Sequence, residues 1–162
     1  MEPLLDAATA AFLGTGCALL VGSALPDGEP IAARGYGCTI VASGPDQAVL
    51  RVLLATDDPR GSAHARPGDL VAVTATSVRT LRSVQLKGRL RAVEPATAED
   101  EASAAAYCAA FFEDIMATDG TAAELLQRMV PAGYVAWLVE VGELFDQTPG
   151  PTAGAALPGS RR

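Results

Sequence analysis

The segment TLRSVQLKGRLRAVE, residues 80–94, decides the fold. Apolar residues occupy alternate positions along it: Val84, Leu86, Leu90 and Ala92. Polar and basic residues occupy the positions between them: Gln85, Lys87, Arg89 and Arg91. A strict period of two over this length predicts a β-strand with one face in a core and the other face in solvent or against a ligand.

Five further strands are expected on either side of this segment. They are residues 17–24 (CALLVGSA), 31–42 (IAARGYGCTIVA), 48–56 (AVLRVLLAT), 70–76 (LVAVTAT) and 134–145 (YVAWLVEVGELF). The pair Asp27-Gly28 predicts a hairpin turn between the first two, because glycine tolerates the positive φ that such turns need. Strands joined by tight turns pair antiparallel, so six of them predict a closed or split barrel.

Helical spacing of apolar residues predicts a smaller number of helices. Residues 4–13 are expected to form one, and Asp58 with Pro59 opens a short second one. Thr97 is expected to cap a helix that runs to residue 116, and a capping box at Thr121 predicts a last helix to residue 129. The fold class is therefore mainly β with helices (α+β), with one domain over residues 1–146 and an extended Pro- and Gly-rich tail over 147–162.

The composition excludes several classes of partner. The 162 residues hold 12 Lys+Arg against 19 Asp+Glu, for a net charge of −7, so nucleic acid and anionic membrane are expected to be repelled. The apolar start has no basic region before it and is interrupted by Gly14 and Gly16, which argues against a targeting segment. No apolar run approaches the roughly 20 residues that span a bilayer. The protein is expected to be cytoplasmic.

Cysteine and histidine are too few and too scattered for a metal site or a Cys-His or Ser-His-Asp catalytic group. Cys17, Cys38 and Cys108 show no CxxC spacing and are expected to be small buried side chains in a reducing compartment. The single histidine, His64, is interpreted as a surface residue of the short helix. No residue declares itself as a catalytic acid or base.

Five of the 12 basic residues fall within residues 79–91, which contain no acid. One interpretation is a solvated strand face, or an edge strand that its charges protect against aggregation. The other is one wall of a site for a small phosphorylated ligand, because Ser83 and Gln85 add directional hydrogen bonds among the cations. Arg34, Arg51 and Arg60 are predicted on or beside neighbouring strands, and guanidinium groups bind phosphate strongly.

Three motifs carry a resemblance to a known family. They are PDGEPIAAR (26–34), RSVQLKG (82–88) and FDQTPGPTAG (145–154). With them, nearly the whole chain resembles the pyridoxamine 5'-phosphate oxidase-like proteins, whose fold is an FMN-binding split barrel. The motifs are fairly specific for this superfamily and much less specific for any reaction.

The resemblance implies a site for the FMN phosphate. Arg34 occupies the place of an arginine that helps to hold the FMN phosphate in flavin-binding relatives. Thr56 and Arg60 match the hydroxyl and one of the two cations that complete the site, whereas the second cation is replaced by Gly61.

The resemblance also implies a ring site on the basic strand. Ser83 stands where the oxidases carry a glutamine that reaches the flavin ring, and Gln85 is expected on the same face. Lys87 follows two residues further along that face. These three residues and the phosphate group of Arg34, Thr56 and Arg60 are the predicted cofactor site.

The resemblance implies a homodimeric FMN-dependent oxidoreductase that acts on a small organic substrate, with the cofactor at the dimer interface. The chain lacks the C-terminal Trp and Arg-rich segment of true pyridoxamine-phosphate oxidases, which argues against vitamin B6 oxidation. A deazaflavin such as F420 is an alternative cofactor. A non-catalytic flavin- or haem-binding module is a second alternative, with haem disfavoured by the single histidine, and a cofactor-free dimeric barrel is a third.

Overall fold

Most of the segment 80–94 belongs to strand β5 (Ser83–Pro95). The computed structural model of the protein describes residues 3–160. Val84, Leu86 and Leu90 are buried inside the sheet, while Lys87 and Arg89 are exposed on its other face. The predicted alternation is confirmed over this part of the strand.

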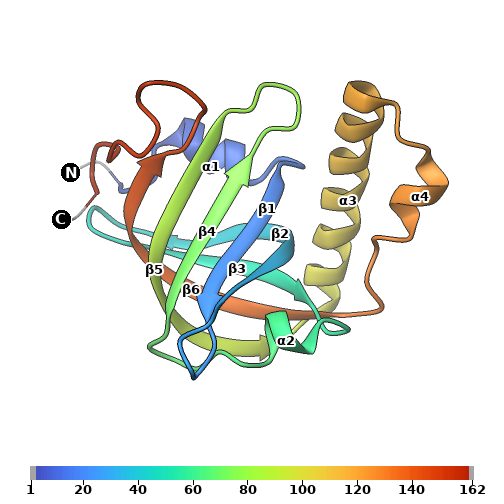
Figure 1. The fold of residues 1–162 in the computed structure, drawn as a ribbon. Helices are drawn as coiled ribbons and strands as arrows, with labels where there is room; N and C mark the ends of the chain where they lie inside the picture. The colour runs from blue at the N-terminus through green and yellow to red at the C-terminus, as the bar shows by residue number, and fades with distance from the viewer. Residues whose placement is uncertain (1–2, 161–162) are drawn as a thin grey trace.

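Within residues 3–160, six strands close into one antiparallel barrel (Figure 1). The other strands are β1 (Ala18–Ala24), β2 (Pro30–Ser43), β3 (Ala48–Ala55), β4 (Leu70–Thr76) and β6 (Tyr134–Asp146). Around the barrel the order is β1-β2-β3-β6-β5-β4, and β4 returns to β1. The predicted six-stranded barrel is confirmed. Because β5 pairs with both β4 and β6, the interpretation of its charges as protection for an edge strand is wrong.

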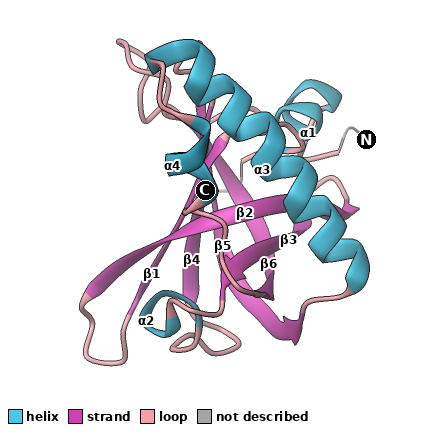
Figure 2. Ribbon diagram, turned by 90° about the vertical axis from the view of Figure 1, so that its right-hand side faces the viewer, coloured by secondary structure: helices cyan, strands magenta, loops and turns pink. Residues whose placement is uncertain are grey.

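Four helices lie outside the barrel in the described part of the chain. They are α1 (Ala7–Leu13), α2 (Pro59–Ser62), α3 (Ala98–Asp119) and α4 (Ala123–Gln127). The long helix α3 runs across the outside of β2, as Figure 2 shows. Helix α4 is shorter than the predicted 121–129, because the Thr121 hydroxyl donates to Asp119 and does not cap the helix.

The barrel interior is filled mainly by Val and Leu, as the low aromatic content requires. Trp137 of β6 is fully buried, and its indole Nε1 donates to the carbonyl oxygen of Ser62 over 3.1 Å. Cys17, Cys38 and Cys108 are buried free thiols, as expected. Burial raises the pKa of Cys38 to about 12, which keeps this thiol protonated and unreactive.

Helix α3 is attached to the barrel by a charged cluster at its N-terminus. Asp100 and Thr97 form a capping box, in which each side chain accepts a hydrogen bond from the other residue's backbone N–H. Arg51 of β3 donates to both carboxylate oxygens of Asp100, over 2.8 and 2.7 Å, and also to Glu94 over 2.6 Å. A bidentate, largely buried pair of this kind fixes the start of the helix against β3.

The Asp100 cluster makes stability depend on pH in a defined range. The Arg51 guanidinium holds the pKa of Asp100 at about 2, below its usual value of 3.8. As the pH falls, the Asp100 carboxylate is therefore protonated in the unfolded chain before it is protonated in the folded chain. Its contribution to the free energy of unfolding is complete above about pH 4 and is lost as the pH falls through about 2.

We expect the wild type to lose about 1–2 kcal/mol more than Asp100→Asn over this range, after allowance for solvent screening. Urea unfolding of both proteins between about pH 6 and pH 2 measures the difference, and it cancels the titration of the other carboxylates. Equal pH dependence in the two proteins would contradict the assignment.

The segment that follows β6 folds back on it. Asp146 and Leu157 donate backbone hydrogen bonds to the carbonyl oxygens of Ala155 and Leu144, both over 2.9 Å, and Phe145 forms an isolated bridge with Ala156. Residues 147–154 thus form a loop at the end of β6, referred to below as the tail loop.

One face of the barrel carries no helix in the described part of the chain. The outer surfaces of β1, β4 and β5 face the viewer uncovered in Figure 1, with α3 to one side and α2 below. This surface is referred to below as the bare face. None of the helices among residues 3–160 is both long and apolar enough to cross a membrane.

Candidate functional site

The strand register lines up five outward-facing residues in one row across the barrel. Arg34 of β2 pairs with Leu20 of β1, which pairs with Thr74 of β4. Thr74 pairs with Gln85 of β5, which in turn pairs with Phe145 of β6. Directly paired residues point to the same side of a sheet, so two predicted site residues, Arg34 and Gln85, share this face.

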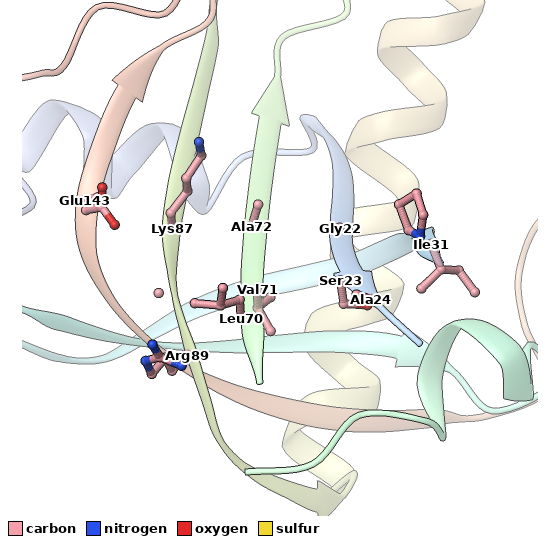
Figure 3. A pocket seen from close by; sticks show the side chains of 12 residues that line it. Gly22, Ser23, Ala24, Ile31, Leu70, Val71, Ala72, Lys87, Arg89 and Glu143 are labelled. Atoms are coloured by element: carbon pink, nitrogen blue, oxygen red, sulfur yellow. The ribbon is translucent and has the colours of Figure 1, made fainter. Parts of the chain in front are cut away.

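An open cavity of about 650 Å³ lies beside this row on the bare face (Figure 3). Its floor is made of small and apolar residues, among them Gly22, Ile31 and Ala72. Lys87 and Arg89 reach it from β5, and Glu143 reaches it from β6. An apolar floor with cations at its rim is suited to a planar, partly apolar anion.

Two cations of the site rest on aromatic rings. The ammonium of Lys87 lies 4.6 Å from the centre of the Phe145 ring, and the guanidinium of Arg34 lies 5.5 Å from that of Phe111 in α3. Neither cation forms an ion pair among residues 3–160. A ring face orients a cation without neutralising its charge, so both remain able to bind an anion.

The basic residues before β5 have a different task. Arg79 pairs with Asp114 of α3, and the guanidinium of Arg82 lies 4.6 Å from the centre of the Phe12 ring in α1. These two cations therefore hold helices against the barrel. The clustering of charge in residues 79–91 combines helix anchoring with the site on the bare face.

The predicted phosphate residues lie at the α2 end of the barrel. Gly35 pairs with Leu54, so the antiparallel register brings Arg34 opposite Ala55, the residue before Thr56. Thr56 is exposed directly after β3, and Arg60 forms an exposed ion pair with Glu29 over 2.7 Å. A phosphate would have to compete with Glu29 for Arg60.

Gly61, in the place of the second cation, cannot simply be replaced. It is buried, and a Cβ at this position would overlap the carboxylate of Asp58 and the side chain of Ala33. Asp58 accepts a hydrogen bond from the Gly61 N–H over 3.0 Å, which starts α2. A cation at this position would therefore require α2 to move away from β2.

The residues of β5 that are predicted to contact the flavin ring differ in whether their polar atoms are free to bind a ligand. Ser83 is only 5% exposed, and its hydroxyl bonds with Thr76 Oγ1 and donates to the Leu81 carbonyl, both over 2.9 Å. Gln85 is half-buried on the bare face, and its Nε2 donates to Thr74 Oγ1 over 3.0 Å. The carbonyl end of the Gln85 amide is left largely available.

The expectation that His64 is a surface helix residue is wrong. It follows α2, packs edge-on against Trp137 and lies 2.9 Å from the Ser23 hydroxyl through its Nε2. Its Nδ1 is buried and has no hydrogen-bond partner among the described residues. His64 is half-buried, with its Nε2 against Ser23 and its Nδ1 covered. A haem ligand needs a ring nitrogen that is free to reach the iron.

The structure brings the predicted residues into two groups. Ser83, Gln85 and Lys87 follow one another on β5, whereas Arg34, Thr56 and Arg60 lie around β2 and α2. Of the six, Lys87 lines the cavity. The two rings under Lys87 and Arg34 belong to β6 and α3, which no local sequence signal connects to these cations.

Comparisons with known proteins bear on the fold. The protein HupZ of Group A Streptococcus superposes with a TM-score of 0.53 at 12% identity, over 92% of this chain and 98% of its own. The chain has the split-barrel fold. The fold implied by the resemblance to the pyridoxamine 5'-phosphate oxidase-like proteins is thereby confirmed.

Two other solved structures align less closely. An F420 reductase gives a TM-score of 0.44 at 16% identity, over 83% of this chain and 93% of its own. A pyridoxamine 5'-phosphate oxidase-related, FMN-binding protein of Nostoc punctiforme gives 0.40 at 12% identity, over 85% and 78%. No protein-family model matches the sequence of this split barrel, and no curated protein does so either.

Proposed function

We propose that the bare face binds FMN and that the protein is a flavin-dependent oxidoreductase acting on a small organic substrate. The observation that carries this proposal is the Lys87 ammonium beside the apolar cavity of the bare face, in a barrel whose register places Arg34 of the neighbouring β2 on the same outer side of the sheet. Each cation rests on a ring, and neither forms an ion pair within residues 3–160; Glu143 is the cross-strand partner of Lys87. An amphipathic anion would supply a negative charge for the cations and an apolar surface for the cavity.

The spacing of the two groups suits an elongated ligand. Three strand-to-strand steps separate Arg34 from Gln85, which corresponds to about 14 Å along the sheet. The phosphate is assigned to the end with Arg34, Thr56 and Arg60, and the ring to Gln85 and Lys87 on β5. The absence of a cation at Gly61 is expected to weaken phosphate binding by about one to two decades in affinity.

The proposed site includes a second copy of the chain. Side chains on the outside of a barrel diverge, so one copy cannot enclose a ligand that lies across its bare face. Leu20 and Leu70 are large apolar residues on this face, and they are 52% and 66% exposed. A homodimer formed across the bare face would bury both and cover the ligand.

Each residue of the site has a defined task in this proposal. FMN, when bound, supplies hydride transfer between its ring and the substrate. The Lys87 ammonium favours negative charge on the ring, and Phe145 keeps that ammonium in place. The Gln85 amide orients the ring through directional hydrogen bonds, and the apolar floor at Ala72 excludes water.

The direct test is to identify the small molecule that the purified protein carries. The protein is expressed in a flavin-containing host, denatured, and the released molecule is identified by mass and absorbance. We expect FMN, close to one per chain. Release of F420 would replace the cofactor in the proposal. A protein that carries no ligand and does not bind added FMN would overturn the proposal in favour of a cofactor-free barrel.

Arg34→Gln is expected to weaken FMN binding by about 10- to 100-fold, because one charge-assisted hydrogen bond to phosphate is lost. Riboflavin, which has no phosphate, should bind the variant as it binds the wild type. Fluorescence titration with both flavins measures this, with Arg128→Gln, at an exposed residue directly after α4, as the matched control. Unchanged FMN affinity would place the phosphate elsewhere.

A further inference from the structure

The tail loop is held in a single shape by Asp146, the last residue of β6. Its backbone N–H and carbonyl bond to Ala155 and Gly154, over 2.9 and 2.6 Å. Its carboxylate accepts hydrogen bonds from the Thr148 N–H and the Thr152 hydroxyl, both over 2.9 Å. The bond from the Thr148 backbone favours the ionised carboxylate and lowers the pKa of Asp146.

The tail loop is also bonded to β5, beside the bare face. The Gln147 N–H donates to the Ser83 carbonyl over 2.9 Å, and the Ser83 N–H donates to Thr148 Oγ1 over 3.0 Å. The first bond continues the β5–β6 ladder by one step, and the second ties the Thr148 side chain to β5. They place the half-buried side chain of Gln147 next to Gln85.

Three neutral polar side chains consequently stand in line on the bare face. Gln147 Nε2 lies 3.5 Å from Gln85 Oε1, and Gln85 Nε2 donates to Thr74 Oγ1 over 3.0 Å. A separation of 3.5 Å is at the weak limit for a hydrogen bond, so the two amides are neighbours that a ligand can engage without breaking a strong contact. The buried Ser83 hydroxyl, in contrast, is committed to Thr76 and Leu81.

We propose that Gln147, presented by the tail loop, is a ring-contacting and specificity-determining residue, acting with Gln85 on the polar edge of the flavin ring. This inference rests on the proposed function. The pyrimidine edge of a flavin alternates carbonyl, N–H and carbonyl groups, and a primary amide offers an acceptor beside a donor. In this chain the tail loop thus performs the task that the resemblance assigns to position 83.

Gln147→Leu is expected to weaken the binding of FMN and the binding of riboflavin by the same factor, about 5- to 10-fold, because one neutral hydrogen bond to the ring that they share is lost. This result differs from that of Arg34→Gln, which affects FMN alone. Both flavins are titrated by fluorescence. The matched control is Gln47→Leu, the same substitution at an exposed residue of the β2–β3 turn.

A second variant guards against a purely structural effect. Gln147→Glu keeps the shape of the side chain but removes its hydrogen-bond donor, so it should weaken the binding of both flavins at least as much as Gln147→Leu does. The midpoint of thermal unfolding should stay unchanged. Wild-type affinity in both variants would overturn the role of Gln147 while the Arg34 result still supports the flavin site. If the wild type binds neither flavin, the proposed function fails and this inference fails with it.

Discussion

Replacing Asp100 with alanine is expected to lower the free energy of unfolding by about 3 kcal/mol. Asp100 is 7% exposed and accepts two hydrogen bonds from Arg51 and one from the Thr97 N–H. Its loss leaves the Arg51 guanidinium largely buried with Glu94 as its remaining carboxylate partner, and it removes half of the capping box. Urea unfolding followed by the fluorescence of Trp137, the single and fully buried tryptophan, measures the change.

Glu99→Ala is the matched control, since Glu99 lies in the same helical turn but is exposed. It should cost no more than about 0.5 kcal/mol, the size of an exposed charge–dipole interaction. Equal losses in the two variants would show that the charged cluster does not anchor α3. Replacing Arg51 with methionine in the Asp100→Ala background should recover part of the loss, because the unpaired charge is then removed as well.

Gly88→Ala is expected to destabilise the protein by about 3 kcal/mol or more, because a close backbone approach has to open. The β5–β6 register shifts between Lys87 and Gly88, and a Cβ at Gly88 would overlap the carbonyl group of Glu140. Backbone cannot rotate away as a flexible side chain can. Because Gly88 lies between Lys87 and Arg89 in the cavity lining, the variant should also lose flavin binding.

Gly142→Ala gives the comparison for this prediction. Gly142 lies on β6 within the same register shift, but a Cβ there would meet its nearest neighbour, the Asp46 carbonyl oxygen, at an ordinary 3.6 Å. The free energy of unfolding of the Gly142→Ala variant should stay within about 1 kcal/mol of the wild-type value, as measured by urea unfolding. If Gly88→Ala behaves like Gly142→Ala, the two strands can separate at this point without cost.

Features of the fold that depend on local pattern could be predicted from the sequence. The alternation in β5 reflects a strand with one buried face, and Asp27-Gly28 makes the expected turn, with Gly28 at φ 88°. Thr97 caps α3 because its hydroxyl reaches a backbone N–H only three residues away. Thr121 has an equally good pattern but bonds to Asp119, since a nearer acceptor competes.

The state of each site residue depended on partners that are distant in sequence. Ser83 is buried by contacts that include Thr148, 65 positions away, so its spacing on β5 gave no sign that its hydroxyl would be occupied. The sequence around His64 predicts a polar helix residue, but closure of the barrel places Ser23 and Trp137 against its ring. The row from Arg34 to Gln85 likewise exists only because β1 and β4 lie between their strands.

The position of α3 and α4 between two paired strands has a consequence for how the chain folds. β5 and β6 are neighbours in the barrel, yet residues 96–133 separate them in the sequence, and β1 must likewise find the distant β4. Helix α3 has its own cap and can form within about a microsecond. Closing the two long-range pairings is slower, so refolding is expected to take milliseconds to seconds and to be limited by the search of these strands for each other.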